Sequence, residues 1–431
     1  MKKKYISYLM LAVLALSFTG CVKNYSDPAR ATQDDVNTST KGLTGVAVSL
    51  QSRYAAGRGN IYNTITASGF LANELVLLNQ GNTAELQLSL GGTSLDGGNT
   101  LLSNLWSNSN KIVFDANLVI SNSANIADKA LVSGLVGYAS IFKALAMGDM
   151  AAFWEKIPAG TGENVTFITR AEAYTKIVAD IDLALANIAA TPISTAFLGT
   201  IPAGIDIPNT LRALKARYAL YGGNLPLALA TANSVDLTKK SSFQHNATIN
   251  QNGIFVAVTG TNNLWQPISN TLGLPAGLTP DAADKRIPFY LSENLTIAPR
   301  WRMAGFASAL TSEWPVYLPG EMTLIKAEVY ARQTAPDLGN ALIELNKIVT
   351  KKPAADPFGV GADLTPLAGL NATQIIAEIY KQRSIEMFLS GQRLEDSRRL
   401  GRPQAERKRN FVNYPFRERD QNPNTPTDPT F

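Results

Sequence analysis

Apolar residues recur every three to four positions along most of the chain, which is the spacing of an amphipathic helix. The segment 171–188 shows this most clearly, because its apolar residues fall on one helical face: Ala173, Ile177, Ile181, Leu185 and Ile188. The same spacing predicts further helices at 43–54, 61–78, 105–119, 131–150, 211–221, 226–234, 324–332 and 338–349. We therefore predict a mostly α-helical protein.

Two of the predicted helix pairs look like copies of one unit. In each pair a Tyr-Ala dipeptide closes the first helix, a short turn follows, and an alanine lies in the second helix: Tyr218, Ala219 and Ala228, then Tyr330, Ala331 and Ala341. Small residues that alternate with aromatic residues across a helix hairpin are typical of tetratricopeptide-like packing. The sequence therefore favours tetratricopeptide-like helix pairs.

Two segments lack the helical spacing. The segment 80–100 is rich in Gly, Asn, Ser and Thr and has no aromatic residue, which predicts a long loop with a strand at about 85–90. The segment 241–319 has frequent prolines and three tryptophans. We interpret it as a loop-rich, irregular cap region on the helical scaffold, with short strands at 253–260 and 287–291.

The N-terminus has the features of a lipoprotein leader. Three lysines at positions 2–4 precede an apolar run at 6–18, which is too short to cross a bilayer. Small residues then precede Cys21, the only cysteine, in a pattern that resembles a lipobox. We predict a lipoprotein signal peptide at 1–20, acylation of Cys21 by palmitate-like chains, a flexible tether at 21–41 and a single domain at 42–431. An ordinary secretory peptide is the alternative.

Composition narrows the classes of function. The chain has 431 residues, of which 45% are hydrophobic and 17% are charged, as in globular proteins. Its net charge of +5 comes largely from the last forty residues. The sequence has no basic stripe with interleaved aromatic residues elsewhere, so we do not expect nucleic-acid binding. The single histidine, His245, has no clustered Cys, Asp or Glu beside it in the sequence, so we predict no metal site. The sequence contains no nucleotide-binding or zinc-protease motif, so we predict no cofactor.

Paired charges mark the C-terminal part of the chain. A helix that Thr373 would cap and Gly391 would end carries Arg383 and Glu386, and a second helix at 392–400 carries Arg393 and Asp396. Each pair is three residues apart and shares a helical face. The four residues could close a buried cluster at the glycine corner, or they could form two solvated pairs.

The same stretch resembles a known family. The run at 383–401, RSIEMFLSGQRLEDSRRLG, looks like the C-terminal signature of the SusD/RagB family, with matches at Arg383, Glu386, Gly391, Arg393, Asp396, Arg399 and Gly401. It departs from that pattern at Ser390 and Ser397. Further likenesses are Asp284-Lys285-Arg286, which resembles the family's D-x-R, and the ending Tyr414-Pro415-Phe416 with Asn422-Pro423.

The resemblance implies a function as well as a fold. Members of that family are nutrient-binding outer membrane lipoproteins, so it implies a surface-exposed, lipid-anchored protein of the cell outer membrane. Such a protein would bind an oligosaccharide or other nutrient without catalysis and deliver it to a TonB-dependent (SusC-like) transporter. Two alternatives stay open: a hydrolase of surface glycans that uses paired carboxylates such as Glu293, Glu313 and Glu321, and a helical scaffold that binds only protein.

The cap region holds the candidate ligand-binding residues. An indole face can stack on a sugar ring while neighbouring guanidinium groups donate hydrogen bonds, which makes Arg300-Trp301-Arg302 the sharpest candidate. Other aromatic residues of the region that could join this platform are Trp265, Tyr290 and Trp314.

Overall fold

The computed structural model describes residues 39–259, 263–296 and 298–430. The predicted signal peptide, Cys21 and nearly all of the predicted tether lie outside the described residues, so those predictions stand untested. Helix α3 begins at Thr40, within the last two residues assigned to the tether. Its N-terminus is capped by Ser39, whose hydroxyl accepts a hydrogen bond from the Gly42 amide at 3.1 Å.

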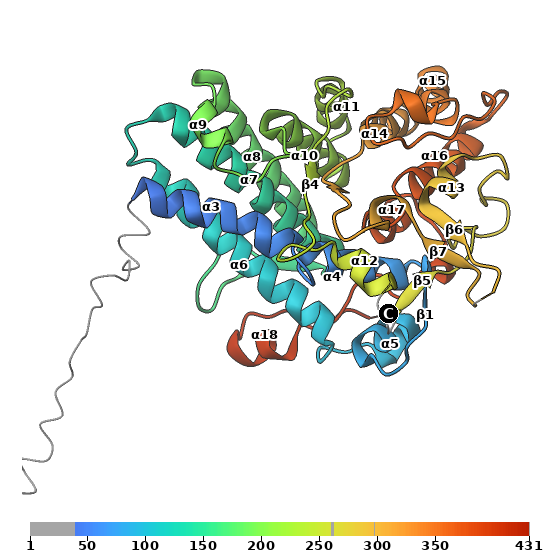
Figure 1. Ribbon diagram of the computed structural model, residues 1–431, viewed down its shortest axis with the longest axis horizontal. Coiled ribbons are helices and arrows are strands. Elements are labelled where there is room, and N and C mark those ends of the chain that lie inside the picture. The colour runs from blue at the N-terminus through green and yellow to red at the C-terminus, as the bar shows by residue number, and fades with distance from the viewer. Residues whose placement is uncertain (1–38, 260–262, 297, 431) are drawn as a thin grey trace, which may run out of the picture.

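Helices dominate the described chain, as the apolar spacing predicts. In chain order they are α3 (Thr40–Ala55), α4 (Asn60–Leu71), α5 (Thr83–Leu90), α6 (Thr100–Ser123), α7 (Lys129–Phe153), α8 (Arg170–Ala190), α9 (Thr195–Leu198), α10 (Ile207–Tyr221), α11 (Leu225–Asn233), α12 (Gly253–Thr259), α13 (Arg286–Tyr290), α14 (Pro319–Arg332), α15 (Leu338–Val349), α16 (Ala372–Glu386), α17 (Arg393–Arg399) and α18 (Phe416–Gln421). Figure 1 shows α3 and α6 to α10 on the left and α14 to α17 on the right.

Helix α7 is the centre of the left-hand part. It contacts α6, α8, α10 and α3, and its glycines let neighbouring side chains approach the helix backbone. A Cβ atom on Gly134 would lie 2.3 Å from the Phe197 ring, and one on Gly148 would lie 2.1 Å from the Tyr218 hydroxyl. Helix α7 is also long and apolar enough to cross a membrane, but most of it is buried inside the protein, as in the core helix of a soluble fold.

The predicted helix pairs are present. Helices α10 and α11 form one hairpin, α14 and α15 form the other, and α11 packs against α14, so that the two hairpins are neighbours. In the second turn Asp337 caps α15 and its amide donates to the Tyr330 carbonyl at 2.8 Å. The prediction of a mostly α fold built on tetratricopeptide-like pairs is confirmed.

The strands are short and pair only in twos within the described residues. They are β1 (Leu75–Leu77), β2 (Lys156–Pro158), β3 (Phe167–Thr169), β4 (Ser242–Phe243), β5 (Trp265–Pro267), β6 (Leu291–Glu293), β7 (Trp301–Met303) and β8 (Trp314–Pro315). The antiparallel pairs are β1–β5, β2–β3, β4–β8 and β6–β7. Pair β1–β5, with Leu77 opposite Trp265, joins the cap to the scaffold.

Several predicted boundaries are wrong for reasons of tertiary structure. The helix predicted at 61–78 ends at Leu71, because Asn73 takes a left-handed backbone (φ 60°) and the chain continues as β1. The segment 83–90, predicted as loop and strand, is helix α5, whose Leu88 is fully buried. The strand predicted at 253–260 is helix α12, because the Asn252 side chain accepts from the next amides of that helix.

The cap and the C-terminal part show two further corrections. The strand predicted at 287–291 is mostly helix α13, and only its last residue begins β6. Helix α16 is capped by Asn371 rather than by Thr373, and it ends at Glu386, before the predicted Gly391. The rest of the described segment 241–319 has short strands between irregular stretches, and this loop-rich character was predicted.

The glycines of the scaffold give a matched test of packing. Gly148→Ala should lower the free energy of unfolding by about 1–3 kcal/mol, because the new methyl group would overlap Tyr218. Gly45→Ala should instead raise it by about 0.5–1 kcal/mol, since nothing lies within 4 Å of that position on α3. Urea unfolding of both variants measures the difference, and equal effects would contradict this account of α7.

Candidate functional site

The charged residues of the C-terminal part lie inside the protein. Arg383, Glu386, Arg393 and Asp396 are each at most 4% exposed. The Arg383 Nε donates to Asp396 Oδ2 at 2.9 Å, and Arg399 donates to the other oxygen of Asp396 at 2.5 Å. Helices α16 and α17 are therefore joined across the glycine corner by a buried ion pair, which a second pair within α17 extends.

The other two charges reach partners outside the corner. Glu386 pairs with Arg286 at 3.2 Å and with Lys351. Arg393 donates to the Leu272 carbonyl at 2.8 Å and lies 3.8 Å from Glu74. The prediction that the four residues close one cluster is thus wrong in its pairing, because both helices face inward and meet Glu74 after α4, Arg286 of α13 and Lys351 after α15.

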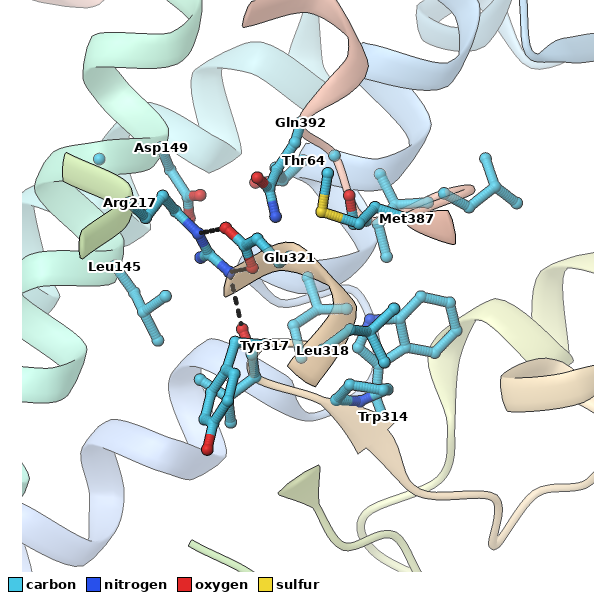
Figure 2. A pocket seen from close by; sticks show the side chains of 18 of the residues that line it. Thr64, Leu145, Asp149, Arg217, Trp314, Tyr317, Leu318, Glu321, Met387 and Gln392 are labelled. Carbon is cyan, nitrogen blue, oxygen red and sulfur yellow. Dashed lines mark hydrogen bonds and ion pairs between the residues drawn. The ribbon is translucent and has the colours of Figure 1, made fainter. Parts of the chain in front are cut away.

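An enclosed cavity lies between the helical scaffold and this corner. Figure 2 shows Arg217 between Asp149 and Glu321, with Trp314 and Leu318 on the apolar side and Gln392 above. Arg217 binds Glu321 through two hydrogen bonds of 2.6 Å and donates to the Val316 carbonyl at 3.2 Å. None of the wall residues is exposed, and the volume of about 90 Å³ is enough for several water molecules.

Two buried carboxyl groups near this interior hold their protons unusually tightly. Burial raises the pKa of Asp149 from 3.8 to about 7, although hydrogen bonds such as the one from Asn60 oppose the rise. Burial likewise raises the pKa of Glu74 to about 7, against the opposing charge of Arg393. Asp149 lines the cavity, and its raised pKa brings its ionisation close to neutral pH.

The predicted aromatic platform is not assembled. Trp265 is fully buried in β5, and Tyr290 is 2% exposed with its hydroxyl donating to the Glu386 carbonyl at 2.5 Å. Trp314 is 7% exposed and lines the enclosed cavity. The prediction that these three join a surface platform is wrong, because their large apolar area is used in the core of the cap.

The Arg300-Trp301-Arg302 segment lies in the β6–β7 hairpin. Arg300 is exposed, pairs with Glu293, and lies over the half-buried Trp301 ring with 5.4 Å between its Cζ and the ring centroid. Arg302 donates to the carbonyls of Pro299 and Trp301. The guanidinium groups are therefore engaged within the hairpin, and Trp301 alone of the predicted aromatic residues keeps a partly open face.

Two open clefts flank the turn between α3 and α4, a place that the sequence interpretation missed. We call Gly57-Arg58-Gly59 the α3–α4 turn. The cleft on one side has about 490 Å³ and is lined by Ser49, Ser52, Arg53, Ala56, Arg58, Gly59 and Asn108. The cleft on the other side has about 440 Å³ and is lined by Gly57, Arg58, Tyr62, Asn82, Gln251, Gly253, Val256, Ala257, Asn263 and Leu264. An arginine between two glycines at a helix break was the available sequence signal.

The three carboxylates considered for hydrolysis all have cationic partners. Glu321 is buried against Arg217, and Glu293 pairs with Arg300. Burial opposes ionisation of Glu313, but hydrogen bonds from Lys240, Ser242 and Gln244 hold its pKa below the usual value. Glu313 therefore lacks the raised pKa of a general acid. No group of three or more potential metal-ligating residues occurs in the part of the chain that the structure describes.

Comparison with known proteins identifies the fold. No protein-family model matches the sequence, and no curated protein matches it either. A SusD superfamily protein from Bacteroides vulgatus superposes with a TM-score of 0.68 at 13% identity, over 90% of this chain and 98% of the other. A SusD-like carbohydrate-binding protein from Bacteroides fragilis gives 0.67 at 14% identity, over 85% and 87%.

A laminarin-binding SusD-like protein also matches, with a TM-score of 0.60 at 15% identity over 91% of this chain and 99% of the other. Many of the solved structures similar to this chain are SusD superfamily or SusD-like carbohydrate-binding proteins. The SusD-like fold that the C-terminal resemblance predicts is therefore confirmed.

The Arg217–Glu321 pair allows a test of buried charge. Arg217→Met should lower the free energy of unfolding by about 3–5 kcal/mol, because Glu321 would stay buried without its partner. Replacing both residues, as Arg217→Met with Glu321→Leu, should recover most of that loss. Arg300→Met, which breaks the exposed pair with Glu293, should cost under about 1 kcal/mol. A double variant no more stable than the single one would contradict this reading.

Asp149 should make stability depend on pH. Its folded pKa of about 7 exceeds the unfolded value of 3.8, so its contribution is full below pH 3.8 and is lost as the pH rises through 7. The unfolding free energy of the wild type, relative to Asp149→Asn, should fall by up to about 4 kcal/mol over this range. The unfolding free energy of the wild type relative to Glu313→Gln should instead rise as the pH rises, because the folded pKa of Glu313 is lowered. Urea titrations across this pH range give the comparison.

Proposed function

We propose that the protein is a surface lipoprotein that binds an oligosaccharide or another nutrient and delivers it to a TonB-dependent outer membrane transporter. The observation that carries this proposal is the likeness in fold along nearly the whole chain to proteins described as carbohydrate-binding or laminarin-binding. The C-terminal run at 383–401 also supports it, because it resembles the SusD/RagB signature and its charged residues form buried ion pairs here.

We place ligand binding at the clefts beside the α3–α4 turn. Both clefts present amides and hydroxyls beside the guanidinium groups, and one of them lies where the scaffold meets cap helix α12. Amide groups both donate and accept hydrogen bonds, which suits the dense hydroxyl groups of a sugar. The enclosed cavity of Figure 2 is too small and too buried to admit an oligosaccharide.

The proposed activity is binding without catalysis. A hydrolase that uses two carboxyl groups needs one with a raised pKa at the substrate. The clefts have no carboxylate among their described wall residues, and Asp149 and Glu74, whose pKa values are raised, are buried. This arrangement favours a binding protein over a hydrolase.

A binding screen tests the proposal. Purified protein without the leader should bind at least one member of an oligosaccharide panel, and Gln251→Ala should weaken that binding because Gln251 lines the cleft beside α12. Asn187→Ala, an exposed amide on α8, should leave it unchanged. New reducing ends in the mixture would indicate a hydrolase. Co-purification of a large barrel protein without any affinity for small ligands would favour a protein-binding scaffold.

The proposed anchor has its own test. Cells that express the full chain should incorporate labelled palmitate into the wild type and not into the Cys21→Ser variant, since the thiol is the acylated group. Equal labelling of the two proteins would overturn the lipoprotein proposal while leaving ligand binding untouched.

A further inference from the structure

Two exposed arginines, Arg53 near the end of α3 and Arg58 in the α3–α4 turn, have no acidic partner among the described residues. The Arg53 Nη1 donates only to the side-chain oxygen of Asn108, at 3.4 Å, and Arg58 lies over the Tyr62 ring with its Cζ 5.2 Å from the ring centroid. Neither forms an ion pair with any residue that the structure describes. Arg217, Arg286 and Arg383, by contrast, each bind a carboxylate.

The surroundings of these arginines do not neutralise them either. No Asp or Glu is among the described residues that line the two clefts, whose polar groups are the neutral amides and hydroxyls of Ser49, Ser52, Asn82, Asn108, Gln251 and Asn263. A guanidinium group has five N–H donors and no acceptor. The positive charge on both sides of the turn is therefore available to an incoming anion.

The turn itself is held in place by close backbone contacts. Gly57 has a left-handed backbone (φ 54°), and a Cβ on Gly253, at the start of α12, would lie 2.0 Å from the Gly57 carbonyl oxygen. The Asn63 side chain donates to the Arg58 carbonyl at 3.2 Å. These contacts fix the backbone that carries Arg58 against the cap before any ligand arrives, which lowers the entropy lost on binding.

The ring beneath Arg58 is fixed as well. Tyr62 donates its hydroxyl to Glu85 at 3.1 Å, and its side chain is buried. A guanidinium group that stacks on such a ring keeps its N–H edge free for a planar anion. Arg58 thus lies over a fixed ring of α4 and lines the clefts on both sides of the turn.

From this arrangement we infer that the oligosaccharide carries a negative charge, as a carboxylate or a sulfate ester, and that Arg58 binds this group with help from Arg53. The inference rests on the proposed function, which it narrows to acidic oligosaccharides. Arginine pairs with carboxylate or sulfate oxygens through two parallel hydrogen bonds, which are stronger than bonds to neutral hydroxyls. Neutral sugars would use only the amides and leave both charges unpaired.

Calorimetric titration of the protein without its leader tests the inference. The probes are oligogalacturonides, the same oligomers after chemical reduction of their carboxyl groups, a sulfated galactan oligomer and inorganic sulfate. One or both charged oligomers should bind at least about tenfold more tightly than the reduced one. That advantage should shrink as the salt concentration rises.

Two variants test whether the effect depends on the position of Arg58 or only on the net charge of the protein. Arg58→Gln should lose at least about tenfold in affinity for the charged oligomer and little for the reduced one. Arg417→Gln removes the same charge from an exposed arginine in another cleft, which contains Glu418, and should change neither affinity. Thermal unfolding should show that both variants stay folded.

The outcomes distinguish this inference from the proposed function. Equal binding of charged and reduced oligomers, unaffected by Arg58→Gln, would overturn the inference and leave carbohydrate binding in place. Inorganic sulfate that binds as tightly as the charged oligomers would also overturn it, because the site would then recognise an anion alone. Failure of every oligosaccharide, charged or neutral, in this titration and in the wider panel would instead remove the proposed function.

Discussion

Buried ion pairs at the C-terminal corner are the constraint on which the rest of the structure depends. Arg383 with Asp396 joins α16 to α17, and Glu386 with Arg286 and Lys351 joins α16 to the cap and to the segment after α15. Each charge is costly to bury alone, so every partner has to be in place for the corner to be stable. The corner thereby fixes where the last helices stand relative to the helix hairpins and the cap.

That fixed geometry explains the interior beside it. The Arg217–Glu321 pair links the two helix hairpins across the enclosed cavity, and Asp149 of α7 completes the polar side of the same space. Arg217 is paired there with Glu321 and with the Val316 carbonyl, while the aromatic residues of the cap close the apolar side. Trp265, Tyr290 and Trp314, which the sequence places in a predicted ligand platform, are thus packed between the cap and the scaffold.

The surface that remains for a ligand is built differently from the core. At the α3–α4 turn the arginines have no carboxylate partner among the described residues, whereas those of the corner are paired. The turn combines close glycine contacts, which make its backbone firm, with charged side chains that face outward. A firm backbone that carries arginines without carboxylate partners is suited to ligand recognition. The arginines of the C-terminal corner are instead paired with carboxylates and hold the fold together.

The sequence by itself determined the helical class, the helix hairpins and the C-terminal charge pattern. These features depend on spacing between nearby residues, such as the apolar pair Ile177 and Ile181 or the charged pair Arg383 and Glu386. Only the tertiary structure decided which charges pair, which tryptophans are buried and where an open cleft forms. Arg393 pairs with Glu74, more than three hundred residues away, and Trp265 is covered by a strand contact with Leu77. Such contacts depend on how distant segments pack, and the order of residues along the chain does not encode them locally.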